Sequence, residues 1–149
     1  MAVHFQGAIL SSVSSEVRIR EEVLQSAAEL LEERFRPAAI LLYGSQATGS
    51  AGPASDVDLA IVTGGPVDTF ALAAAKTDLE EVVGSPVDLA VLDGASPILR
   101  MEVLRGCRIL RKRDPELFET FVVRALGEYF DLKKVREPIE RALLAGGRA

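Results

Sequence analysis

Two acidic residues and a glycine–serine pair are spaced for one kind of chemistry. Gly44-Ser45 is followed, after ten residues, by Asp56-Val57-Asp58. Side chains alternate between the two faces of a strand, so Asp56 and Asp58 point the same way if a strand begins here. Carboxylates on one face repel each other unless a cation lies between them, and such oxygen ligands suit Mg²⁺. Because a loop of small residues can also present backbone N–H groups to phosphate, the pattern indicates phosphoryl or nucleotidyl transfer.

A third acidic residue, Asp88, lies inside the apolar run 86–92. An acid within a buried strand is costly unless it is paired or binds a metal ion. If this run lies beside the strand that begins at Asp56, Asp88 completes a cluster of three carboxylates. Such a cluster can hold two Mg²⁺ ions, one for the attacking hydroxyl and one for the triphosphate. Asp93 has the opposite parity, so we interpret it as a turn residue.

Other sites for phosphate or nucleophilic chemistry fit the sequence less well. An ordinary pair, with Asp56 in a turn and Asp58 bound to an arginine, is the alternative for the two acids. No Gly-Lys-Ser/Thr follows the loop and no G-x-G-x-x-G follows a strand, which excludes a P-loop and a dinucleotide fingerprint. Cys107 and His4 are the single cysteine and histidine. Catalysis by a serine or cysteine with a histidine base is therefore not expected, and we interpret Cys107 as a packing residue.

The elements that must position these residues alternate along the chain. Apolar runs predict strands over 38–43, 56–62 and 86–92, with a fourth strand over 108–111 at a sheet edge. Helical spacing predicts helices from Ser14 or Ser15 to about Phe35, over 68–83 and over 96–106. The buried side of the first of these helices is predicted to contain Val23, Ala27, Leu30, Leu31 and Phe35. For residues 1–13 we predict no regular element and allow for partial disorder.

C-terminal helices are predicted over 114–149, with a break or kink near Pro138 and a frayed end from about residue 146. An apolar stripe continues along these helices and consists of Leu132, Val135, Ile139 and Leu143. Lysines and arginines flank it. The stripe has two interpretations, a docking surface for a partner or simple packing onto the domain.

Composition limits the class of protein. The chain has 149 residues, of which 48% are hydrophobic and 26% charged, typical of a single globular domain over 1–149. Its net charge of −5 argues against direct nucleic-acid binding. A single cysteine fits a cytoplasmic location, and no apolar run reaches the ~20 residues that span a bilayer. A local basic segment, 100–113, could serve the triphosphate, a partner or simply a solvated face; its basic residues are Arg100, Arg105, Arg108, Arg111, Lys112 and Arg113.

The motif resembles that of the DNA polymerase β-like nucleotidyltransferases, and the chain length resembles their minimal (MNT) branch. The similarity extends past the motif. The runs 86–93, 99–110 and 129–132 are similar to the MntA-type antitoxins of HEPN/MNT toxin–antitoxin systems. The resemblance implies an α/β (α+β) fold with a small mixed β-sheet and covering helices.

The resemblance also implies roles. Gly44 and Ser45 would engage the nucleotide phosphates, and Asp56, Asp58 and Asp88 would be catalytic and bind the metal, with two Mg²⁺ ions expected. ATP would be the substrate, and AMP would pass to a tyrosine hydroxyl of a cognate HEPN-domain toxin. Two alternatives stay open: a binding module that neutralises its partner by contact alone, and a nucleotidyltransferase that acts on a small molecule. The sequence shows no separate domain to bind an acceptor, which favours a second protein as the acceptor.

Overall fold

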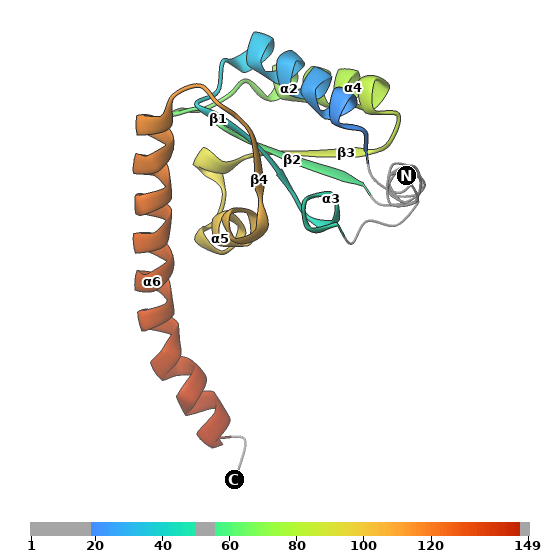
Figure 1. Ribbon diagram of the computed structural model, residues 1–149. Helices are drawn as coiled ribbons and strands as arrows, with labels where there is room; N and C mark the ends of the chain where they lie inside the picture. The colour runs from blue at the N-terminus through green and yellow to red at the C-terminus, as the bar shows by residue number, and fades with distance from the viewer. Residues whose placement is uncertain (1–18, 50–55, 147–149) are drawn as a thin grey trace, which may run out of the picture.

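The structure, a computed structural model, describes residues 19–49 and 56–146. The expected disorder of 1–13, the start of the first helix, most of the loop before Asp56 and the frayed end from residue 147 lie outside the described residues. Within the described chain the elements alternate between helix and strand around one sheet (Figure 1).

Four strands form a mixed sheet in the order β3-β2-β1-β4. They are β1 (Ala39–Tyr43), β2 (Val57–Val62), β3 (Val87–Val91) and β4 (Arg108–Lys112). β1 is antiparallel to both β2 and β4, whereas β2 and β3 are parallel. The predicted α/β fold and mixed sheet are confirmed, and so is the edge position of β4. β1 is buried on both faces, as its apolar sequence indicates, because it lies inside the sheet.

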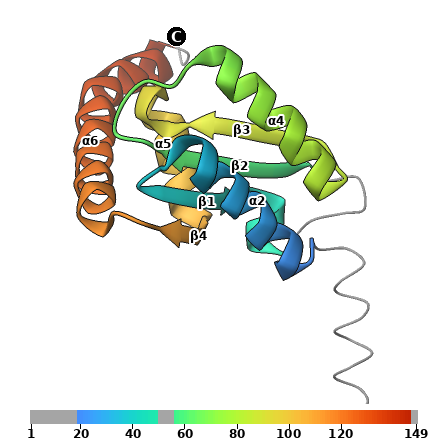
Figure 2. The ribbon, with the colours of Figure 1, turned by 90° about the horizontal axis from the view of Figure 1, so that it is seen from above.

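Two helices cover one face of the sheet, α2 (Glu21–Phe35) and α4 (Thr69–Val83), which lie side by side (Figure 2). Asp68 caps α4 as predicted, since its carboxylate accepts a hydrogen bond of 3.2 Å from the backbone N–H of Ala71. The helix links β2 to the parallel β3, as a crossover must. The fully buried residues of α2 are Leu24, Ala27, Ala28 and Leu31. The predicted buried side was thus correct at Ala27 and Leu31, and Leu30 and Phe35 are partly buried and pack against the same core.

The other face carries η1 (Leu92–Gly94), α5 (Pro97–Gly106) and the first half of α6 (Pro115–Gly146). Alternating residues of the strands divide between two clusters: Val57, Leu59 and Ile61 face α2 and α4, whereas Ala60 and Val62 face α5 and α6. Asp93, the predicted turn residue, lies in η1. Its carboxylate accepts hydrogen bonds from the backbone N–H of Thr63 (2.7 Å) and Gly64 (2.8 Å). These bonds connect the chain just after β2 to η1.

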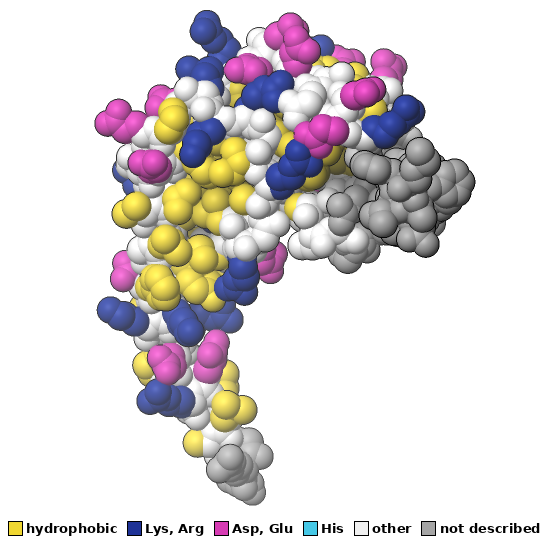
Figure 3. Space-filling view, in the orientation of Figure 1, with side chains coloured by type: hydrophobic (Ala, Val, Ile, Leu, Met, Phe, Trp, Pro, Cys, Tyr) yellow, Lys and Arg dark blue, Asp and Glu magenta, His cyan; other side chains and the backbone are white. Residues whose placement is uncertain are grey.

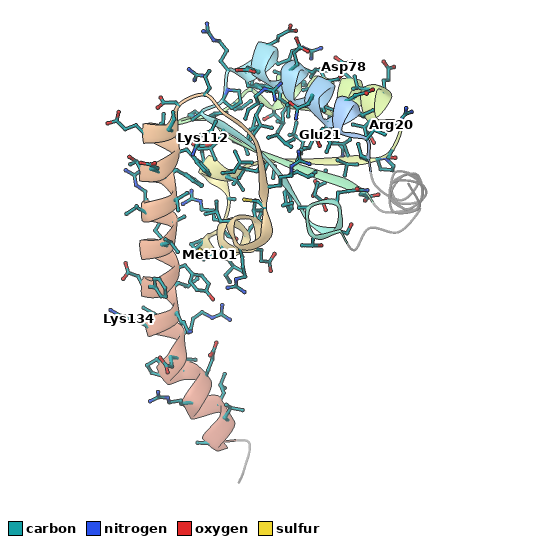
Figure 4. All side chains as sticks on the ribbon, in the orientation of Figure 1. Arg20, Glu21, Asp78, Met101, Lys112 and Lys134 are labelled. Atoms are coloured by element: carbon teal, nitrogen blue, oxygen red, sulfur yellow. The ribbon has the colours of Figure 1, made fainter. Side chains whose placement is uncertain are left out.

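The basic segment 100–113 makes contacts within the domain. Of the arginines in this segment that form an ion pair, Arg100 is the most buried. It donates hydrogen bonds to Glu128 (2.7 Å) and to the carbonyl of Leu92 (2.9 Å), and its guanidinium lies over the ring of Phe121. The other arginines with such contacts are Arg108 with Glu21, Arg111 with Glu32, and Arg113 with the carbonyl of Pro37. Figure 4 labels Glu21 at the start of α2 and Lys112 at the end of β4. These arginines therefore connect β4 and α5 to α2 and α6.

The C-terminal segment is one helix rather than several. α6 continues without a break through Pro138, and the helix bends along its far half (Figure 1). Two ion pairs, Arg136–Glu140 and Arg141–Glu137, stabilise this half of the helix. In each pair the partners lie four residues, or about one turn, apart. In the part of the chain that the structure describes, no helix is long and apolar enough to cross a membrane.

We call residues 133–146 of α6 the α6 extension, because they project beyond the domain, with Lys134 near their start (Figures 1 and 4). Apolar side chains lie on this projection (Figure 3). The exposed fractions of Val135, Ile139 and Leu143 are 65%, 57% and 71%. The interpretation that the stripe packs onto its own domain is therefore wrong beyond Leu132, and the docking surface stays a prediction.

Replacing Val135, Ile139 and Leu143 with glutamine should change the free energy of unfolding by no more than about 0.5 kcal/mol per site, because exposed side chains contribute little to stability. Phe118, in the same helix but only 6% exposed, is the matched control. Phe118→Ala should cost about 3–5 kcal/mol. Denaturant unfolding measures both, and a loss of several kcal/mol from the triple glutamine variant would show that the extension packs on the domain.

Candidate active site

The register of the two parallel strands brings two of the predicted acids together. Asp58 in β2 and Asp88 in β3 are directly paired positions. Both strands begin at the same end of the sheet, beside α3 (Ser45–Thr48), whereas α6 begins at the opposite end (Figure 1). Paired residues on adjacent strands project from the same face, so the two carboxylates are neighbours.

Asp56 precedes β2 by one residue and is exposed. After burial and the charge of Asp88, the charge of Asp56 is a further cause that raises the pKa of the Asp58 carboxyl. Among residues 19–49 and 56–146, no three histidine, cysteine or acidic side chains form a group that could hold a metal ion as they stand. The donor set suits Mg²⁺ in kind, because all three groups are carboxylates, but their side chains would have to come closer together to hold one ion.

Gly44 lies against Asp58. It has φ +69°, and a Cβ built on it would lie 2.2 Å from Asp58 Oδ2. No side chain fits in that space, and the left-handed backbone region favours glycine as well. The glycine of the motif therefore lets the chain turn from β1 into α3 directly beside the carboxylate. Ser45, the other predicted residue of the loop, is half-buried and opens α3.

Tyr43 is a residue of this site to which the sequence analysis gave no role. It pairs with Asp58 across β1 and β2, and its hydroxyl donates a hydrogen bond of 3.4 Å to Asp88 Oδ2. Its position before Gly44 was visible in the sequence. The contact with Asp88 depends on the order of the strands, which the sequence did not fix.

The like charges shift two pKa values in the site. The pKa of the Asp58 carboxyl is raised, first by partial burial and then by the charges of Asp88 and Asp56. The pKa of the Tyr43 hydroxyl is also raised, first by partial burial and then by Asp88 and Asp58. At neutral pH the site therefore concentrates negative charge around a neutral phenol, which is an environment that attracts cations.

Asp88 differs from the expectation in one respect. The sequence analysis treated it as a buried acid, but its side chain is exposed. β3 is one of the two edge strands of the sheet, and along it Val87 is buried whereas the next residue, Asp88, is exposed. Asp88 is therefore not the buried acid that was predicted, whereas its predicted place beside Asp58 is confirmed.

Two cavities of the described chain lie away from these acids. These cavities, of about 400 and 530 Å³, share Gly64, Asp93, Phe121 and Arg124, at the opposite end of β2 from Asp58. The acids instead lie at an open end of the sheet, where Asp56 and Asp88 are exposed. An open, acidic site suits the transfer of a group to a large acceptor better than the enclosure of a small one.

A small mixed sheet with acids paired across its parallel strands, and with a glycine turn against them, defines a class of enzymes that transfer nucleotidyl groups. The chain belongs to the polymerase beta nucleotidyltransferase family, whose model matches residues 25–116. The match includes the glycine turn and all three predicted acids. No curated protein matches the chain.

Solved structures of toxin–antitoxin systems share the fold. A toxin–antitoxin structure with AMP-PNP is 25% identical, with a TM-score of 0.72, covering 80% of this chain and 98% of the other. A chain in the structure of a tri-AMPylated Shewanella oneidensis HEPN toxin in complex with an MNT antitoxin is 23% identical, with a TM-score of 0.69, covering 83% of this chain and 98% of the other. The toxin–antitoxin MntA-HepT is likewise 23% identical, with a TM-score of 0.69, covering 84% and 99%. The predicted minimal nucleotidyltransferase fold is confirmed.

Gly44→Ala should damage activity through Asp58. The new methyl group meets Asp58 Oδ2 and must displace the carboxylate, and a misplacement of about 1 Å can cost on the order of 10²-fold in rate. We expect at least this loss in nucleotidyl transfer at saturating Mg²⁺.

Gly84→Ala is the matched control for that variant. Gly84 also has a positive φ, of +76°, but nothing lies within 4 Å of its Cβ position. Gly84→Ala should lose about 1–2 kcal/mol of stability from backbone strain, and Gly44→Ala should lose more because its methyl group also meets Asp58. Only Gly44→Ala should lose activity per folded molecule. Equal activity of the two variants would contradict the close approach of Gly44 to Asp58.

Asp58→Asn should stabilise the protein in the absence of divalent metal. A raised folded-state pKa means that the charged carboxylate opposes folding, so stability is lost as the pH rises through that pKa. At neutral pH we expect a gain of at most about 1 kcal/mol, because solvent screens the site. The gain should disappear toward the ordinary Asp pKa of about 3.9.

Asp131→Asn, which removes an exposed charge from α6, is the matched control and should leave stability unchanged. Mg²⁺ should raise the melting temperature of the wild type and of Asp131→Asn but not that of Asp58→Asn, since only an intact site binds the ion. Thermal unfolding between pH 4 and 8, with and without Mg²⁺, measures both effects. A destabilised Asp58→Asn would show that the carboxylate is held by favourable contacts instead.

Proposed function

We propose that this nucleotidyltransferase transfers AMP from ATP to a tyrosine hydroxyl of a cognate HEPN-domain toxin, and so acts as the antitoxin of the pair. The observation that carries the proposal is the direct pairing of Asp58 with Asp88 beside the glycine turn. The similar toxin–antitoxin structures with AMP-PNP and with an AMPylated HEPN toxin support the nucleotide and the acceptor.

Each predicted residue has a role in the proposal. Asp56, Asp58 and Asp88 would hold divalent metal, with Mg²⁺ and two ions as the expected set, and Gly44 and Ser45 would engage the phosphates of ATP. When bound, the metal supplies positive charge that stabilises the phosphates and lowers the pKa of the attacking hydroxyl. The negative field around Asp58 is suited to bring such cations to the site.

The chain's own groups provide the remaining chemistry. Asp88 Oδ2 already accepts a hydrogen bond from a phenol, that of Tyr43, so it is placed to accept the proton of an incoming tyrosine hydroxyl. Gly44 keeps the backbone close to Asp58 and leaves no side chain to block the phosphates. Exposure of Asp56 and Asp88 leaves the site open to a tyrosine on another protein.

The proposal includes a cytoplasmic location and no direct contact with nucleic acid, which follow from the single cysteine and the net charge of −5. The α6 extension is a candidate contact with the toxin, because its exposed apolar stripe has no cover within the described chain. Neutralisation by contact alone, through such a surface, is the alternative that an experiment must separate from transfer.

The Asp56→Asn, Asp58→Asn double variant tests the enzymatic account. With ATP labelled at the α-phosphate, Mg²⁺ and a cognate HEPN-domain protein, label on the toxin should fall by at least about 10²-fold, because the carboxylates that hold the catalytic charge are gone. Toxin activity should be restored in the same reaction.

Asp131→Asn serves as the control and should label and neutralise the toxin as the wild type does. If the double variant binds and silences the toxin fully without labelling it, neutralisation is by contact and the enzymatic account fails. Label in the small-molecule fraction, with none on protein, would instead indicate a small-molecule acceptor.

A further inference from the structure

A tyrosine hydroxyl already lies within the site. Tyr43 is the last residue of β1, an interior strand, and it pairs with Asp58 in β2. Its ring packs against the core cluster beneath α5 and α6, while its hydroxyl reaches Asp88 Oδ2 at 3.4 Å. The backbone of the sheet thus fixes where this phenol is presented, without any contribution from a partner.

We propose that Tyr43 is an internal acceptor of AMP, so that the chain adenylylates itself at this residue; the inference rests on the proposed adenylyl transfer. The group that Tyr43 presents is the same group that a toxin tyrosine would present. It is bound to the carboxylate that is placed to take the acceptor's proton. An acceptor held in position has a large kinetic advantage over one that must diffuse in.

The step balances without any further reactant. A bond forms between Tyr43 Oη and the α-phosphorus of ATP, and the bond from that phosphorus to the oxygen that bridges to the β-phosphate breaks. Pyrophosphate leaves with that oxygen. The phenolic proton passes to Asp88 Oδ2, which accepts its hydrogen bond at the start. The product is an aryl phosphodiester that joins AMP to Tyr43.

The chain offers a direct control. It has two tyrosines, and the other, Tyr129, lies in α6, where it lines a hollow with Ile98 and Leu132 and has its ring against Phe130. Self-modification by proximity should therefore occur at Tyr43 and not at Tyr129.

AMP on Tyr43 would lie beside Asp58 and Asp88 and would occupy the place of an incoming acceptor. Self-modification should therefore compete with transfer to a partner. Incubation with ATP and Mg²⁺ before the partner is added should lower the subsequent labelling of the partner by the wild type. Tyr43→Phe, compared with its own activity without prior incubation, should show no such decline.

The closing experiment combines the full-length chain, ATP labelled at the α-phosphate, Mg²⁺ and the HEPN partner, and locates the label by peptide mass analysis. Tyr43→Phe should reduce AMP on the antitoxin at least about 10-fold, whereas Tyr129→Phe should not. Thermal unfolding of each variant ensures that folded proteins are compared.

The outcomes separate the two proposals. Label on the partner, with Tyr43 unmodified, overturns self-adenylylation and leaves the proposed function intact. Label on Tyr43 with none on the partner supports self-adenylylation and overturns transfer to the toxin. No label on either chain overturns both, and label on the antitoxin that persists in Tyr43→Phe overturns the choice of residue.

Tyrosine fluorescence tests the geometry without turnover. The chain has no tryptophan, so in Tyr129→Phe the emission comes from Tyr43 alone. A phenol bound to a carboxylate emits weakly, and Mg²⁺ that engages Asp88 should change this emission even without ATP. Asp88→Asn should abolish the response to Mg²⁺. An emission that Mg²⁺ leaves unchanged would show that the Tyr43 hydroxyl lies outside the metal site and would overturn the inference.

Discussion

The structure depends on one arrangement that is unfavourable by itself: two carboxylates placed side by side by the parallel pairing of β2 and β3. Nothing in the local sequence favours this contact, and together with the partial burial of Asp58, which is the larger cause, it raises the pKa of that carboxyl. The contact is imposed by the rest of the fold. Five consecutive residue pairs hold the two strands in register, and the buried faces of Leu59, Ala60 and Ile61 anchor the central strand. The apolar core thus offsets the repulsion that makes the site attractive to cations.

The arginines of the basic segment show how the rest of the domain is kept in place. Arg100 joins η1, α5 and α6 through one guanidinium, and Arg108 and Arg111 join the edge strand β4 to α2. These three arginines thus bind elements of the domain to one another. Among the described residues, no ion pair to Asp56, Asp58 or Asp88 accompanies these contacts.

The sequence predicted the strands, the cap of α4 and the motif residues because each depends on local pattern: apolar runs, Asp68 before a helix, and Gly44 before the turn. It could not fix what depends on strand order. The exposure of Asp88 follows from the edge position of β3, and the Tyr43–Asp88 contact follows from β1 and β3 lying on either side of β2. The sequence also could not predict that the end of α6 projects from the domain. An apolar stripe at helical spacing has the same sequence pattern whether another element covers it or it is exposed to solvent.

The length of the α6 extension limits how close a partner bound at its far end could lie to the domain. Its 133–146 segment is a helix that rises about 1.5 Å per residue, so it reaches roughly 20 Å beyond the domain. The helix is continuous over this span, although it bends and contains Pro138, so the extension would act as a spacer rather than as a flexible tether. A partner protein that binds the far end of the extension would be held at a set distance from Asp58 and Asp88. Only a segment of the partner that is long enough to span this distance could then bring a hydroxyl to the acids. Selection of the acceptor would then be a matter of reach, in addition to the chemistry of the residue that is modified.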